Sequence, residues 1–294
     1  MQWPHQNNAQ DGLIFPQNIG AHLSIDETCL SHGELYTVVT NKHAKGRKGT
    51  IVAILNGTKS ESIIPILRRI PFKLREKVKE ITLDLASNMA LIARKCFPNA
   101  VQVIDRFHVQ QLATQALQEV RIKHRWQAID DENHAIELAK RTKEAYNPEI
   151  YSNGDTKKQL LARSRYLLYR AEHKWTADQV ERASILFEKY PDIKKAYRLA
   201  RELSRIFNTS GCRQIAFARL ARWSNQTEYA GFKSFNTVAN TINIHHDNIL
   251  NYFDNKSTNA SAESFNAKIK AFRSQFRGVG NINFFLFRLT KLFA

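Results

Sequence analysis

Cysteine is scarce in this chain, and long apolar runs are missing. The three cysteines, Cys29, Cys96 and Cys212, lie far apart and form no CxxC pair, so a zinc ribbon within the chain is not expected. Their odd, low number fits a reducing cytoplasm. No apolar stretch is long enough to cross a bilayer, and the first residues lack the apolar core of a signal peptide. These absences predict a soluble, cytoplasmic protein with no membrane partner.

Acidic residues are also few, with 27 Asp and Glu against 44 Lys and Arg and a formal charge of +17. Such an excess, not confined to a tail, is typical of proteins that bind a polyanion, and it favours a nucleic-acid partner. The GxSxG, P-loop and HExxH patterns are absent. With 294 residues, 43% of them hydrophobic, the chain can bury a full core in one large domain or two smaller ones.

Short β-branched runs dominate the first third of the chain, after a polar lead-in over residues 1–20. Close spacing of the first three runs predicts an antiparallel meander, and alternating helices and strands follow. This is the order of an RNase H-like sheet, so we expect a mixed α/β core over residues 21–108. The expected strands are 23–30, 34–40, 49–55, 80–85 and 101–105, with helices at 60–78 and 87–96.

Helical periodicity replaces the strand pattern over residues 109–253, which predicts a large all-α insertion. Thr176 and Gln179 have the spacing of a capping box. Residues 254–294 are expected to complete the core with two helices. The expected helices are 109–123, 157–169, 176–190, 193–207, 259–276 and 283–293. Arg163 lies on one of them and faces either a DNA channel or solvent.

Three aspartates occupy strand positions that suit a site. Asp26 shares a strand face with Ser24 and also reads as the start of a turn. Asp84 and Asp105 each close a strand, where ligands gather in an open sheet. Each also reads as a helix N-cap. Asp105 and His108 have the spacing of one helical face.

Glu263 follows Ser257, Thr258 and Asn259, which can cap a helix. It reads either as a site residue or as a surface salt-bridging Glu. The face after it is basic and resembles a phosphate contact surface, formed by Lys268, Lys270, Arg273 and Arg277.

Carboxylates on separate elements suit Mg²⁺ or Mn²⁺, which prefer hard oxygen ligands. Such ions activate a water or 3′-hydroxyl and stabilise the leaving oxygen without a covalent protein nucleophile. Together with the basic composition, this pattern predicts phosphodiester chemistry on nucleic acid.

Several motifs, in order, resemble the catalytic domain of bacterial insertion-sequence DDE transposases of the ISL3 family. The most specific is the block from Phe-Pro-Asn-Ala at residues 97–100 to Asp-Arg-Phe-His at 105–108. The others are Ser-Ile-Asp-Glu-Thr at 24–28, Thr-Leu-Asp-Leu-Ala at 82–86, Leu-Gln-Glu-Val-Arg at 117–121 and Asn-Ala-Ser-Ala-Glu-Ser-Phe-Asn at 259–266.

The resemblance implies an RNase H-like core with a helical insertion before the last carboxylate. It also implies Mg²⁺- or Mn²⁺-dependent DNA cleavage and strand transfer at transposon ends, by a homo-oligomer on DNA. Asp26 maps onto the first acidic position and Glu263 onto the last. We prefer Asp84 for the middle position over Asp105, which with His108 would support the site.

One departure from the family concerns the start of the chain. Relatives carry an N-terminal zinc-binding and helix-turn-helix region, whereas here Asp26 follows Met1 closely and no CxxC is present. The chain is therefore expected to be a catalytic half, a truncated copy or one product of a split gene. Two other functions stay open: a structure-selective nuclease of the same fold, and a decayed or domesticated transposase that only binds DNA.

Overall fold

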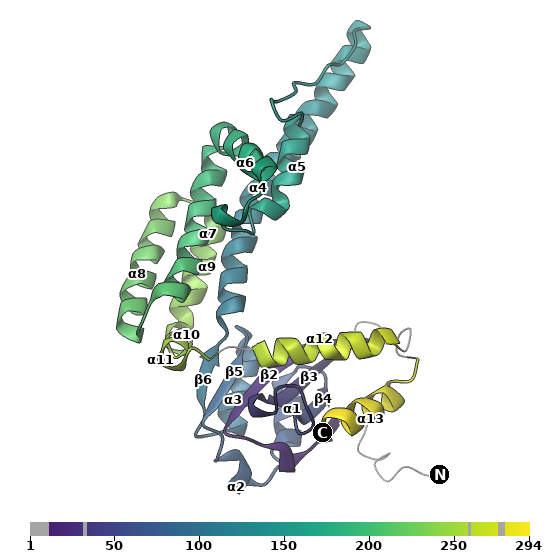
Figure 1. The fold of residues 1–294 in the computed structure, drawn as a ribbon, viewed down its shortest axis with the longest axis vertical. Coiled ribbons are helices and arrows are strands. Elements are labelled where there is room, and N and C mark those ends of the chain that lie inside the picture. Colours follow the sequence, from purple (N-terminus) through teal and green to yellow (C-terminus); the bar gives the residue numbers. More distant parts are fainter. Residues whose placement is uncertain (1–11, 32–33, 258–259, 276–279) are drawn as a thin grey trace. The chain divides into compact units, whose positions relative to one another are not determined.

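The chain forms two compact units in the computed structural model, which describes residues 12–31, 34–257, 260–275 and 280–294 (Figure 1). The sheet unit joins Met1–His108 to His245–Ala294, and the helical unit is Val109–Ile244. The sheet unit is therefore built from two stretches that the whole helical unit separates in sequence.

Within the described residues, a six-stranded mixed sheet forms the centre of the sheet unit, in the order β1-β4-β3-β2-β5-β6. Strands β2, β3 and β4 are antiparallel, whereas β5 and β6 run parallel to β2. The expected mixed α/β class is confirmed. The strands are β1 (Gly12–Ile14), β2 (His22–Ser31), β3 (Glu34–Asn41), β4 (Ile51–Asn56), β5 (Glu80–Leu83) and β6 (Val101–Ile104).

Strand β1 lies in the stretch for which the sequence predicted only a lead-in. It pairs with β4, with Gly12 opposite Leu55. Gly12 has a φ of +136°, and a Cβ there would lie 2.6 Å from the Leu55 side chain. The strand therefore depends on a close approach that only glycine permits.

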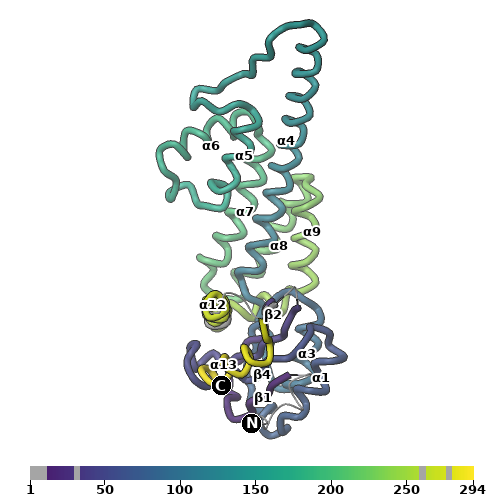
Figure 2. The backbone as a smooth tube through the Cα atoms, turned by 90° about the vertical axis from the view of Figure 1, so that its right-hand side faces the viewer, coloured from purple at the N-terminus to yellow at the C-terminus, as the bar shows by residue number. Residues whose placement is uncertain are grey.

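The two faces of the sheet differ because side chains alternate along each strand. Helices α1 (Ser60–Leu67) and α3 (Ser87–Cys96) lie on one side, and α12 (Ala260–Gln275) and α13 (Ile282–Phe293) on the other (Figure 2). Leu23 and Ile25 of β2 are fully buried. Ser24 and Asp26 point to the α12 side, where Asn266 of α12 contacts Asp26. Short helices α2 (Phe72–Arg75), α10 (His246–Leu250) and α11 (Tyr252–Asn255) complete the unit.

An apolar cluster fixes α12 and α13 on the sheet. Phe265 and Ile269 sit on one face of α12, four residues apart, and both are buried. They pack with buried side chains of β3, β4 and α13, namely Tyr36, Val38, Ile51, Ile54, Phe285, Leu286 and Leu289. This packing determines which face of α12 meets β2.

The helical unit consists of helices over its whole described length, apart from turns and one isolated bridge (Figure 2). Helix α4 runs far beyond the expected 109–123, and α8 and α9 were not predicted. The helices are α4 (Arg106–Thr142), which starts in the sheet unit, α5 (Lys157–Leu167), α6 (Ala177–Lys189), α7 (Pro191–Thr209), α8 (Arg213–Ala230) and α9 (Lys233–Ile244). In the described part of the chain, no helix is both long and apolar enough for a membrane span.

Local signals behave as expected in this unit. The Thr176 and Gln179 capping box is present at the start of α6. Arg163 forms an ion pair with the fully buried Asp155, which also accepts a 2.7 Å hydrogen bond from Arg182. Burial alone would raise the pKa of Asp155, but the two arginines hold it below its usual range. Arg163 thus has a structural partner.

Candidate active site

Asp26 lies within β2, and Asp84 and Asp105 directly follow the last residues of β5 and β6, the two strands that come after β2 in the sheet. The parallel register that pairs Ser24 of β2 with Thr82 of β5 places Asp26 beside Asp84, two residues further on. The parallel register of β5 with β6 places Asp84 beside Asp105, whose backbone N–H still donates to β5 at 3.1 Å. On the α12 side, Asn266 contacts Asp26, and the charges of Asp105 and Asp26 both act on Glu263.

Asp26 is held from two sides. One carboxylate oxygen accepts the backbone N–H of Glu27 at 2.8 Å, and the other accepts the side-chain amide of Asn266 at 2.7 Å. Burial raises the pKa of Asp26, and the nearby Asp84 carboxylate adds to the rise. The pKa of Asp26 is lowered by the Glu27 N–H, by His108 and by the Asn266 amide, but it still lies above its ordinary value. Asp26 is therefore a partly buried acid beside another acid.

Asp105 makes the helix-capping contact that the sequence offered as an alternative, whereas Asp84 does not, because Ala86 is the N-cap residue of α3 and receives no side-chain cap. An Asp84 oxygen accepts the Ala86 N–H at 2.9 Å just before α3. Asp105, only 2% exposed, accepts the Phe107 N–H at 3.2 Å in the first turn of α4. In each carboxylate, the second oxygen receives no hydrogen bond from a described residue. These backbone hydrogen bonds therefore orient both groups and leave an oxygen of each for another ligand.

Glu263 enters the same neighbourhood from the first turn of α12. Partial burial makes the largest contribution to raising the pKa of its carboxylate. The charge of Asp105 raises it less, and that of Asp26 less again. His108, on the first turn of α4, lowers it. Glu263 therefore interacts electrostatically with Asp26 and Asp105, although it is far from them in sequence.

A buried polar network ties the segment before α12 to the sheet. Lys42 Nζ donates to Thr82 Oγ1 at 2.7 Å and to Glu80 Oε1 at 3.2 Å. It also contacts Ser257 Oγ, which in turn donates to Glu80. Burial would raise the pKa of Glu80, but the Ser257 hydroxyl and the Lys42 charge hold it below its usual value. Ser257 thus anchors the chain close to the start of α12.

Comparison with known proteins decides the family. A family model described as a transposase, that of the ISL3-type DDE enzymes, matches residues 23–289. The chain belongs to the ISL3 family of DDE transposases. The comparisons with curated proteins and with solved structures gave no match. The family makes DNA the substrate of this transposase, and its members generally use divalent metal ions.

Among the described residues of the transposase, no group of three or more His, Cys, Asp or Glu side chains is already arranged to hold a metal ion. The donor set still fits Mg²⁺ or Mn²⁺, because it consists of carboxylate oxygens. Asp26 and Glu263 also have raised pKa values beside other acids, and a bound cation would relieve that repulsion. The choice between Asp84 and Asp105 as the middle acid stays a prediction.

Two residues of the transposase site had been given no role from the sequence. Asn266 lies three residues after Glu263 and therefore on the same face of α12. This spacing could have predicted Asn266 near the site. Glu27 has a pKa raised first by burial and then by Asp84. Glu27 directly follows Asp26 in the strand, so its side chain is expected on the opposite face of the sheet. The sequence therefore gave no reason to expect Glu27 near the site.

The basic residues that the sequence assigned to DNA differ in their surroundings. Lys268 donates to the Gly46 carbonyl at 2.8 Å, so its charge is partly engaged within the unit. Lys270 is exposed and Arg273 half-buried on the same helix. Arg277 lies outside the described residues. DNA contact by these side chains stays a prediction.

Proposed function

We propose that this transposase catalyses metal-dependent cleavage and strand transfer at insertion-sequence ends. Asp26, Asp84 and Glu263 would hold the metal, with Asp105 and His108 in support. The sheet unit would be an RNase H-like core, and the enzyme would act as a homo-oligomer on transposon-end and target DNA.

The link between α12 and β2 carries the proposal. Asn266 donates to Asp26 across 240 residues of sequence, and Glu263 lies on the same face of α12. The charges of Asp105 and Asp26 both raise the pKa of Glu263, which supports an acid cluster that includes Glu263. A surface glutamate in a salt bridge would instead have a basic partner.

The protein's own groups would prepare the site. Backbone N–H groups and Asn266 orient the aspartates, which leaves lone pairs free for a metal. The electrostatic effect of His108 favours the charged forms of Asp26 and Glu263, which metal binding requires. When bound, Mg²⁺ or Mn²⁺ supplies activation of the attacking hydroxyl and stabilisation of the leaving oxygen. Lys270 and Arg273 would attract the DNA backbone.

The test measures strand cleavage and joining of a duplex that carries the sequences flanking this coding region. We expect Asp26→Asn and Glu263→Gln each to lower both rates roughly 1,000-fold or more, because metal ligands contribute several kcal/mol to the transition state. The matched controls are Asp130→Asn and Glu119→Gln, which neutralise exposed acids on α4. Both controls should retain wild-type rates.

Cleavage that persists in Asp26→Asn or Glu263→Gln would contradict the carboxylate mechanism. Cleavage without joined products would replace the proposal with a structure-selective nuclease. Binding with neither reaction would identify a protein that only binds DNA.

A further inference from the structure

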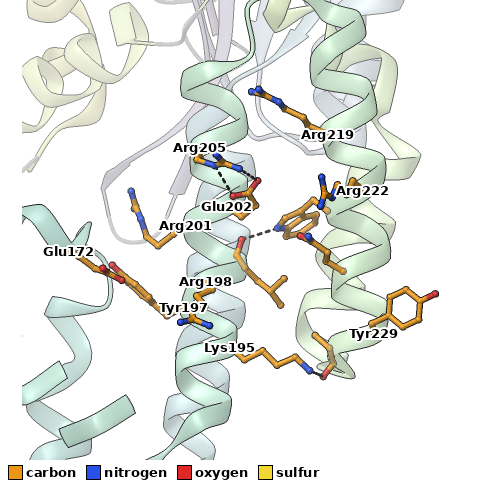
Figure 3. A pocket seen from close by; sticks show the side chains of 14 residues that line it. Glu172, Lys195, Tyr197, Arg198, Arg201, Glu202, Arg205, Arg219, Arg222 and Tyr229 are labelled. Carbon is orange, nitrogen blue, oxygen red and sulfur yellow. Dashed lines mark hydrogen bonds and ion pairs between the residues drawn. The ribbon is translucent and has the colours of Figure 1, made fainter. Parts of the chain in front are cut away.

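The helical unit contains a groove of about 850 Å³ between α7 and α8 (Figure 3). None of the acids of the candidate active site lines it. The groove is formed entirely by residues 172–230, so it belongs to the helical unit alone.

Two buried aromatic side chains line the groove, and their polar groups are already paired. Trp223 is almost fully buried, and its Nε1 donates to the Leu199 carbonyl at 2.9 Å. Tyr197 is also buried, and its hydroxyl donates to the Arg170 carbonyl at 2.9 Å. Specific polar recognition must therefore come from the rim.

The rim is strongly basic, with six Lys and Arg side chains against Glu172 and Glu202. The basic side chains repeat at intervals of three or four residues, which aligns them along facing sides of the two helices. They are Lys195, Arg198, Arg201 and Arg205 on α7, and Arg219 and Arg222 on α8. Figure 3 shows arginines of both helices bordering the groove.

Half of these charges are engaged within the unit. Arg205 binds Glu202 with two hydrogen bonds of 2.8 Å, and Lys195 donates to the Ala230 carbonyl at 3.2 Å. Arg219 donates to the Thr209 hydroxyl at 2.9 Å.

The other half have no such partner. Arg198, Arg201 and Arg222 make no hydrogen bond or ion pair with any described residue, and Arg198 and Arg222 are exposed. Three guanidinium groups gathered in one groove repel each other, and an external polyanion would relieve that repulsion.

An aromatic ring stands at the end of the α8 row. Tyr229 lines the groove and is 88% exposed, which leaves its ring open to a partner. A basic groove next to an exposed aromatic ring is the combination that binds nucleic-acid strands, with phosphates on the cations and bases on the ring.

We propose that this groove binds the phosphate backbone of DNA through Arg198, Arg201 and Arg222. Tyr229 stacks on a base where the DNA is single-stranded. The inference rests on the proposed function, since a strand-transfer enzyme must hold DNA beyond the bonds it cuts. It adds a second DNA-binding surface, on the helical unit, to the one expected on α12.

The test compares the full chain with a triple variant, Arg198→Gln, Arg201→Gln and Arg222→Gln. Binding to a mixed-sequence duplex and to a single strand is measured over a range of salt concentrations. Each lost phosphate contact reduces the slope of log affinity against log salt by about 1, so the triple variant should lose about 3. The matched control, Lys123→Gln, Lys140→Gln and Arg141→Gln, removes equal charge from exposed positions outside the groove and should keep the slope.

Two further variants make the result specific. Replacing the same three arginines by lysine retains the charge and should keep most of the slope, which separates lost contacts from misfolding. Tyr229→Ala should weaken single-strand binding roughly 5- to 150-fold and leave duplex binding unchanged. An equal loss on both DNAs would contradict stacking.

The outcome is independent of catalysis. A wild-type slope in the triple glutamine variant would overturn the groove proposal, even if the wild-type chain cleaves DNA. A reduced slope in a chain that does not cleave would support the groove and count against the proposed function alone.

Discussion

The sheet unit gathers negative charge around β2, β5 and α12, whereas the helical unit gathers positive charge between α7 and α8. Asp26 and Glu263 have raised pKa values because burial and neighbouring acids oppose their ionisation. Arg198 and Arg222 are exposed and lack internal ion pairs. Each cluster lacks a sufficient counter-charge of its own. Under the two proposals, these clusters bind external charges of opposite sign: a metal cation at the acids and DNA phosphates at the arginines.

The two clusters are also assembled differently. The acids come from strands and a helix far apart in sequence, and hydrogen bonds such as that from Asn266 to Asp26 orient them. The arginines come from the period of two helices and need no long-range register. The acid cluster is therefore the more sensitive to small displacements.

The largest expected effect concerns the middle acid. Asp84→Asn should lower cleavage roughly 1,000-fold, and Asp105→Asn roughly 10- to 100-fold, as for a group that supports metal ligands. The side-chain oxygen of asparagine can accept the same backbone hydrogen bonds as that of aspartate, so both variants should melt close to the wild type. Cleavage rates and melting temperatures are measured together. The reverse ranking would assign the middle position to Asp105.

The next effect concerns the positioning residue on α12. Asn266→Ala removes the 2.7 Å hydrogen bond to Asp26 and should lower cleavage roughly 10- to 100-fold. The metal concentration for half-maximal cleavage should rise, while DNA affinity stays constant. Asn240→Ala, at an exposed position on α9, is the control. An unchanged metal dependence would reduce Asn266 to a packing role.

The smallest effect concerns stability without metal or DNA. Because the folded-state pKa of Asp26 is raised, its ionised form costs stability above that pKa, and the cost disappears as pH falls below the unfolded-state value. Asp26→Asn should therefore raise the melting temperature by roughly 2 °C at neutral pH in a chelator, and by less in acid. Arg201→Gln should also stabilise, but equally at both pH values, because guanidinium stays protonated. Thermal scans at both pH values check this contrast.

Much of the fold could be predicted because its signals are local. The runs that predicted strands at 34–40 and 80–85 correspond to β3 (Glu34–Asn41) and β5 (Glu80–Leu83). Strand β1 was missed because it depends on its contact with β4. Helix α8 was missed because its buried face includes the small Ala216 and the polar Thr227, which weaken the apolar pattern.

The site could be predicted only as a set of candidates. Strand ends indicated Asp84 and Asp105, but only the pairing of β5 and β6 next to β2 brings these strand ends near Asp26. The contact between Asn266 and Asp26 depends on tertiary packing of α12. For the same reason, sequence spacing did not reveal which arginines of the helical unit lack partners.

The insertion of the helical unit ahead of α12 has a consequence for biosynthesis. A ribosome releases the strands that carry Asp26 and the two later aspartates long before it reaches α12 (Ala260–Gln275). A nascent or prematurely terminated chain thus holds part of the acid cluster without Glu263 and without the Asn266 that orients Asp26. The order of synthesis therefore delays completion of the proposed catalytic centre until α12 has been made.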